Sequence, residues 1–194
     1  MKKRVCVMGM IHVLCIFLFT IAVSPGWAAH PLITDDTGTQ GKGGFQVELN
    51  GEYEHDDTDA VRTEVTMLSG TFSAGLTERI DLVLGIPVQY ARVVEDTGEG
   101  HDVTTEEGIS DVSAEIKWRF YEREGLSFAI KPGVTFPTGD RDKGLGGGRM
   151  TCSLYLISTL DAGPACFHAN LGYLQNENKN DERCELWHAS VAME

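Results

Sequence analysis

Basic residues are scarce in this sequence, and their scarcity limits the partners that the protein can have. The 194-residue chain carries 16 Lys and Arg against 29 Asp and Glu, a formal net charge of −13. Proteins that bind nucleic acid neutralise its phosphates with the opposite sign of charge. The composition therefore excludes nucleic acid as a partner.

Cysteine is too sparse to supply a disulfide framework. Of the five Cys, Cys6 and Cys15 lie in the first 28 residues, and the odd set Cys152, Cys166 and Cys184 remains. On the strands predicted below, Cys152 and Cys166 face opposite ways on neighbouring strands. No disulfide is therefore predicted.

Catalytic motifs are lacking as well. The glycine-rich segment 144–149, GLGGGR, has no helix to follow it and so does not form a phosphate loop. A serine hydrolase needs a Ser and a His held together, and neither Ser127 nor Ser153 has an evident His partner. We predict that the protein is not an enzyme.

The His, Cys and acidic residues of the chain are not spaced as metal ligands are. Cys166 and His168 share one face of a predicted strand, but pairing of the next strand would leave His188 about 10 Å from the level of His168. Ligands at roughly 2 Å from an ion cannot span that separation. The acidic runs 56–59 and 95–99 do not match the spaced pattern of a calcium loop. We predict no metal site and no cofactor.

A secretion leader is present at the N-terminus. Residues 1–4 contain three basic residues, residues 5–23 are almost wholly apolar, and residues 24–29 supply a breaker and small residues. This order is typical of a Sec-type signal peptide, although nineteen apolar residues could also just span a bilayer as an anchor. We predict a signal peptide over 1–28, cleaved after Ala28 or one residue later. Its removal leaves 13 basic against 29 acidic residues, a net charge of −16.

The remaining chain divides into an irregular start and a long region of strands. Residues 29–43 are rich in Gly, Thr and Asp and show no periodicity, so they predict an irregular lead-in or a plug. Residues 44–194 alternate between apolar and polar side chains, which is the two-residue period of a strand. We assign them to one β-barrel domain.

The clearest alternation is in residues 112–136, which predict a β-hairpin. One face of the first arm carries Val112, Ala114, Ile116, Trp118 and Phe120, and one face of the second carries Leu126, Phe128, Ile130, Val134 and Phe136. Antiparallel partners face the same way, so the turn should hold an odd number of residues. The segment 123–125 fits, with its Gly in the left-handed position of a three-residue loop.

The links between strands predict the topology. Eight strands are expected, at about 44–54, 61–75, 80–94, 112–122, 126–136, 149–160, 165–174 and 186–193. The links at one end are long and mostly acidic: 55–60, 95–110, 138–148 and 175–184. The links at the other end are short: 76–79, 123–125 and 161–164. This asymmetry, with strands near the roughly 9–11 residues that cross a bilayer, is typical of an outer-membrane barrel. A soluble β-protein is the alternative, and we predict an antiparallel up-and-down transmembrane β-barrel.

The polar positions of these strands are predicted to face the lumen. Those singled out are Glu48, Asn50, Glu52, Glu115, Lys117, Arg119 and Lys131. They could form a charged lumen that selects solutes, as constrictions in pores do. The alternative is that they merely neutralise one another inside a small barrel. Trp118 and Phe120 are expected to face lipid near the periplasmic rim.

Three stretches, 30–56, 75–90 and 108–149, resemble an outer-membrane transporter family labelled "MetA-pathway of phenol degradation". The resemblance implies an outer-membrane β-barrel for small, often aromatic or apolar, organic molecules, and it supplies no catalytic residues. Members of the family continue for several more strands, whereas this chain stops at 192–194 partway through a strand pattern. We therefore expect a C-terminally truncated member, since eight strands closed alone would fill their own interior.

The function expected from the sequence is passive diffusion of small organic solutes across the outer membrane of a Gram-negative bacterium. Its partners would be outer-membrane lipid, those solutes and the barrel-assembly machinery. The alternative is a small barrel that does not conduct and acts as a ligand-binding or structural module.

Overall fold

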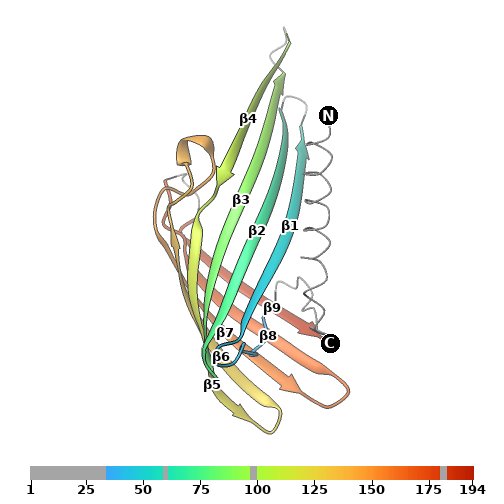
Figure 1. Cartoon of the computed structure of the whole chain (residues 1–194). Coiled ribbons are helices and arrows are strands. Elements are labelled where there is room, and N and C mark those ends of the chain that lie inside the picture. The colour runs from blue at the N-terminus through green and yellow to red at the C-terminus, as the bar shows by residue number, and fades with distance from the viewer. Residues whose placement is uncertain (1–33, 59–60, 97–99, 180–182) are drawn as a thin grey trace, which may run out of the picture. The chain divides into compact units, whose positions relative to one another are not determined.

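The computed structural model describes residues 34–58, 61–96, 100–179 and 183–194 (Figure 1). The predicted signal peptide, 1–28, lies outside these ranges. Within them the regular elements are strands, apart from the single 3₁₀ turn η1 (Arg141–Lys143). No helix in this part of the chain is long and apolar enough to cross a membrane.

The strands form an antiparallel half-barrel in which they follow one another in chain order. They are β1 (Phe45–Asp57), β2 (Val61–Thr77), β3 (Ile80–Asp96), β4 (His101–Ile109), β5 (Val112–Arg123), β6 (Leu126–Phe136), β7 (Thr151–Asp161), β8 (Cys166–Gln175) and β9 (Glu185–Met193). Strands β1 and β9 form the two edges of this sheet, and their described residues do not pair with each other. The prediction of an all-β, antiparallel, up-and-down fold is confirmed.

Strands β4 and β5 together form one interrupted partner of β3. Ile109 of β4 pairs with Val88, and Ser113 of β5 pairs with Gly85, so both strands run along β3 in the same direction. The interruption lies at 110–111, where the Ser110 N–H donates to the carbonyl of Pro87 at 2.9 Å. The nine strands therefore occupy eight positions around the sheet.

The prediction of a long loop over 95–110 is wrong, because residues 101–109 form β4. Strand β3 runs for 17 residues, and the backbone groups of its outer half need partners. Strand β4 supplies them from His101 to Ile109. Polar and acidic residues on both faces of this hairpin hid its alternation. The predicted link at 55–60 is also too long, since β1 extends to Asp57, and the long links that remain are 137–150 and 176–184.

The β5–β6 hairpin turns on two residues, and the predicted three-residue turn is wrong. Glu124 and Gly125 both have positive φ, 51° and 82°, as a type I′ turn requires. The extra residue between the matched arms lies instead in a β-bulge, where the register shifts between Arg119 and Tyr121. The bulge brings the rings of both Phe120 and Tyr121 against Phe128, with centroids 6.3 and 5.9 Å away. A strict two-residue alternation would instead place Tyr121 on the face opposite Phe120.

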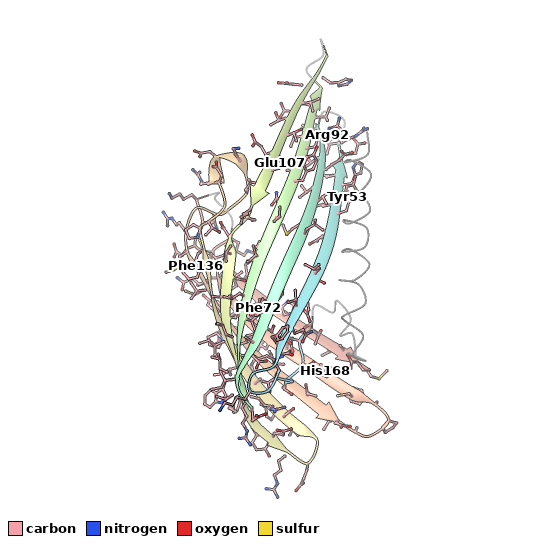
Figure 2. The ribbon with its side chains drawn as sticks, in the orientation of Figure 1. Tyr53, Phe72, Arg92, Glu107, Phe136 and His168 are labelled. Atoms are coloured by element: carbon pink, nitrogen blue, oxygen red, sulfur yellow. The ribbon has the colours of Figure 1, made fainter. Side chains whose placement is uncertain are left out.

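The two faces of the sheet differ sharply in chemistry. One, the apolar face, exposes large side chains from every strand, among them Phe45, Leu49, Leu68, Phe72, Ile86, Val103, Ile109, Ile116, Trp118, Phe136, Leu156, Leu171, Trp187 and Val191. Phe72 and Phe136 are labelled in Figure 2. The other, the polar face, includes Gln46, Thr71, Asp81, Glu115, Lys117, Ser127, Lys131, Tyr155, Thr159, His168 and Asn170. The large hydrophobic side chains of this sheet thus lie mainly outside any core.

Candidate functional site

Residues 34–44, the lead-in, lie against the polar face. The Gln40 N–H donates to Asp81 Oδ2 at 2.9 Å, and the Thr37 N–H donates to Thr159 Oγ1 at 3.1 Å. Thr37, which is 3% exposed, also shares a hydrogen bond between its hydroxyl and that of Ser127. The lead-in is therefore fixed to three strands. The predicted role of 29–43 as a plug stays a prediction, and residues 29–33 lie outside the described ranges.

A glycine turn directs the lead-in onto this face. Gly41 and Gly43 have positive φ, 72° and 80°, a conformation that side chains disfavour. Backbone hydrogen bonds join Gly43 to Gly75 and Gly75 to Gly44, each at 2.9 Å. A Cβ at Gly75 would lie 1.7 Å from the Gly41 carbonyl oxygen. The close approach of the two backbones thus requires glycine on β2.

Asp35 forms the centre of an ion cluster on the polar face. Its Oδ1 lies 2.9 Å from Lys117 Nζ, and its Oδ2 lies 2.9 Å from Lys131 Nζ. Each lysine has a second carboxylate at 3.6 Å, from Asp36 for Lys117 and from Glu115 for Lys131. The lysine side chains are only 11% and 18% exposed. The cluster, Asp35, Asp36, Glu115, Lys117 and Lys131, joins the lead-in to β5 and β6.

Electrostatics favour the ionised form of Asp35. Burial of its carboxyl would raise the pKa, but the positive charges and hydrogen bonds of Lys117 and Lys131 outweigh burial and hold the pKa below its ordinary value. Hydrogen bonds between charged groups are roughly twice as strong as neutral ones. The carboxylate therefore fastens the lead-in across the β5–β6 pair at neutral pH.

The backbone of Asp35 is held by Asn170 of β8. With its amide oxygen toward the Asp35 N–H, Asn170 accepts at 2.6 Å, and its amide nitrogen donates to the Asp35 carbonyl at 2.9 Å. Asn170 is 7% exposed, so this buried amide is satisfied by the lead-in. Asp35 is thus positioned by main-chain and side-chain contacts together.

A cavity of about 240 Å³ opens beside the ion cluster. Lys131 Nζ lies 5.6 Å from the centroid of the Tyr155 ring, within the range of a cation–π contact. The Tyr155 ring also contacts the His188 ring edge to face, with centroids 6.0 Å apart. The cavity is lined by Asp35, Glu115, Lys131, Tyr155, Ile157, Asn170 and His188. It combines one ammonium group and two carboxylates with an amide and with aromatic and aliphatic surface.

Only some of the predicted lumen residues come together. Glu115, Lys117 and Lys131 join the ion cluster, whereas Arg119 lies nearer the short turns, where its Nε is 3.5 Å from Glu122 Oε2. The other three lie on β1: Glu48 accepts a hydrogen bond from Gln46, and Asn50 and Glu52 are exposed. That these seven side chains face a lumen stays a prediction.

Sequence reasoning missed the partners of those lysines. Asp35 and Asp36 lie in a segment without periodicity, so no pattern relates them to a strand more than 80 residues away. Tyr155 and Asn170 occupy polar-face positions of β7 and β8. The adjacent acidic pair in the lead-in, with two unmatched lysines on β5 and β6, was the one available signal.

A second anchored segment lies at the strand interruption. The Asp111 carboxylate accepts from the Gly139 N–H at 2.9 Å and from the Gly147 N–H at 2.8 Å. The Ser110 hydroxyl donates to the carbonyl of Leu145, a residue only 2% exposed. The predicted loop 138–148 is thus folded down onto the interruption and held there by Asp111.

The residues considered as metal ligands have other contacts. His168 Nδ1 lies 2.9 Å from Thr159 Oγ1, and His188 Nε2 lies 3.0 Å from Ser190 Oγ. Among the residues that the structure describes, no three His, Cys, Asp or Glu are grouped to hold an ion. Cys152 and Cys166 are free thiols.

Comparison with protein-family models gives a match over most of the chain. A family model described as "Putative MetA-pathway of phenol degradation" matches residues 28–194. No curated protein matches the chain.

Proposed function

The chain belongs to this family, and from that premise we propose that it is an outer-membrane channel through which small organic solutes diffuse passively. The proposal places the protein in a Gram-negative outer membrane after signal-peptide cleavage, inserted by the barrel-assembly machinery. It assigns the chain no catalytic step. The family description names phenol degradation, so phenol is the first solute to test.

The exposed apolar face is the observation that carries this proposal. Leu49 is 84% exposed, Val191 81% and Phe45 73%, and similar side chains continue across the sheet. Soluble monomers rarely expose apolar patches of more than a few hundred Å². Lipid is the surrounding that suits such a face, because an outer-membrane barrel turns alternate apolar residues outward.

Strand lengths and aromatic positions support the same surroundings. The described strands have 9 to 17 residues, and about 9–11 are enough to cross a bilayer. On β1, Phe45 and Tyr53 are exposed eight residues apart, about 26 Å along the strand, or about 20 Å in height at the usual barrel tilt. Outer-membrane barrels carry aromatic residues at both edges of an apolar band about 25 Å tall.

The polar face supplies the other half of the argument. Lys117, Lys131 and Glu115 lie there among hydroxyl and amide groups, whereas the opposite face is apolar. Transmembrane barrels have this distribution, with water inside and lipid outside. In a channel, the ion cluster would be the feature past which a solute moves.

A second candidate function is a barrel that does not conduct. The lead-in favours it, because Asp35, Thr37 and Gln40 cover part of the polar face. Such a protein would hold a ligand or act through its loops. Both candidates share the membrane position and differ in conductance.

Conductance across a planar lipid bilayer separates the two. The purified protein should produce discrete current steps, and vesicles containing it should admit phenol faster than empty vesicles. A bilayer that contains the protein and stays silent would leave the non-conducting module. Recovery of the protein in the periplasm without detergent would remove both.

A further inference from the structure

Asp35 contacts the two lysines as a bound carboxylate ligand would. Each of its oxygens lies 2.9 Å from a different ammonium group, Oδ1 from Lys117 and Oδ2 from Lys131. The lysines project from adjacent strands, β5 and β6, and their side chains are 11% and 18% exposed. The lead-in that carries Asp35 is irregular and is joined to the sheet by hydrogen bonds of Thr37 and Gln40 and by the Asn170 amide at the Asp35 backbone.

We propose that Lys117 and Lys131 form a binding site for the carboxylate of a small organic acid, and that Asp35 occupies this site when the solute is absent. The proposal rests on the proposed function, since it names the class of solute that the channel would take. An arriving carboxylate would accept one hydrogen bond from each lysine and displace Asp35. The lead-in would then act as a competitor tethered to the site.

Local charge favours a monoanion. Besides Asp35, the lysines have two acidic neighbours, Asp36 at 3.6 Å from Lys117 and Glu115 at 3.6 Å from Lys131. Without Asp35, the two positive charges balance these two negative charges. A bound monocarboxylate would restore the charge that the structure has with Asp35 in place. A dianion such as phosphate would add a second negative charge beside Asp36 and Glu115, and like charges disfavour it.

The neighbouring cavity limits the size of the acid. Its volume of about 240 Å³ lies below the roughly 300–1,000 Å³ of pockets for drug-sized ligands. Tyr155, Ile157 and His188 line it with aromatic and aliphatic surface, and Lys131 and Asp35 lie on its wall. An acid with one ring or a short chain could hold its carboxylate on the lysines and its apolar part in the cavity.

Benzoate is the probe, and benzamide is its uncharged counterpart. Binding to the folded protein in detergent micelles is measured by isothermal titration calorimetry, with folding checked by heat-modifiable gel migration. Apparent affinity falls in proportion to the fraction of sites that are open. If Asp35 fills the site nine-tenths of the time, Asp35→Asn should strengthen benzoate binding about tenfold and leave benzamide unchanged.

Three further variants complete the test. Lys131→Met should abolish benzoate binding, and Asp35→Glu, which keeps the charge, should bind benzoate as the unaltered protein does. Asp102→Asn removes an exposed carboxylate from β4 and controls for net charge, so it should change nothing. If Lys131→Met fails to fold, the difference in benzoate affinity between Asp35→Asn and Asp35→Glu still tests the proposal.

The proposal is overturned if Asp35→Asn and Asp35→Glu bind benzoate equally, or if benzamide gains as much as benzoate. Failure here is separate from failure of the channel, because micelle binding needs no conduction. Benzoate binding with a silent bilayer would leave the site and remove the channel. Conductance without benzoate binding would leave the channel and remove this site.

Discussion

Replacement of Ile116 by Arg should destabilise the protein in a membrane by about 2–4 kcal/mol, the cost of Arg at the midplane on the lipid face of a barrel. Ile116 is 47% exposed on the apolar face and pairs with Leu82 of β3. It lies seven residues before Arg123, the last residue of β5. That is about 23 Å along the strand, or about 18 Å above the short turn at the usual barrel tilt. The site is therefore close to the middle of a hydrocarbon core about 30 Å thick.

Val103→Arg is the matched control. Val103 is 50% exposed and pairs with Val94, fourteen residues beyond Ile80 at the start of β3. It should lie about 46 Å along the strand and about 35 Å above the short turns at the same tilt. That height is beyond the hydrocarbon core, so this substitution should cost less than about 1 kcal/mol.

The assay is equilibrium unfolding in phospholipid vesicles with guanidinium, followed by tryptophan fluorescence. Both variants put the same cation on an equally exposed position, so the difference between them measures depth in lipid. If the apolar face met water, both substitutions would fall within about 0.5 kcal/mol of the unaltered protein. Equal free energies of unfolding for the two variants would refute the lipid assignment.

Three other changes test the contacts that hold the segments in place. The pKa of Asp35 is held below its ordinary value of 3.8, so its contribution to lead-in docking is fully present above that value and is lost as pH falls through the lower, folded-state pKa. Hydrogen exchange at the Gln40 amide should become faster at that acid step. The Asp35→Asn variant should lack the step. Asp111→Ala removes the acceptor for the Gly139 and Gly147 amides and should weaken attachment of the loop to the sheet by about 1–3 kcal/mol. Trypsin should then cut at Arg141 roughly ten to a hundred times faster, while the β-sheet circular dichroism stays unchanged. Gly125→Ala places a side chain at a φ of 82° and a Cβ 2.5 Å from the Asp161 carbonyl oxygen. It should lower the free energy of unfolding in the vesicle assay by at least about 1 kcal/mol. Glu124→Gly relieves a positive φ and should not lower it.

The sequence was sufficient for the strands because one physical signal dominates them. An apolar face and a polar face on the same strand impose a two-residue period, and residues 112–136 show it plainly. The same signal failed at 101–109, where acidic and Thr residues occupy both faces of β4. The alternation also indicated that one extra residue lies between the matched arms of the β5–β6 hairpin, but not where it lies. A bulge near Phe120 and a longer turn change the register equally.

The candidate site was only half accessible to such reasoning. Lys117, Lys131 and Glu115 follow from the alternation of β5 and β6, because polar positions on paired strands share a face. Asp35 does not follow from it, because the path of an irregular segment depends on single turns such as Gly41 to Gly44 and on contacts distant in sequence. The ion cluster is therefore a tertiary feature, while the face that carries it is a local one.

The most direct test of the membrane assignment is quenching of Trp118 and Trp187 by bromine-labelled phospholipids. Both indoles lie on the apolar face, 45% and 72% exposed. In protein that begins after Ala28 and so lacks Trp27, each can be measured alone once the other is replaced by Phe. In vesicles of brominated lipid, the fluorescence of each should fall to a fraction of its value in unlabelled vesicles. Equal fluorescence in the two kinds of vesicle would show that this face does not contact lipid and would contradict the account.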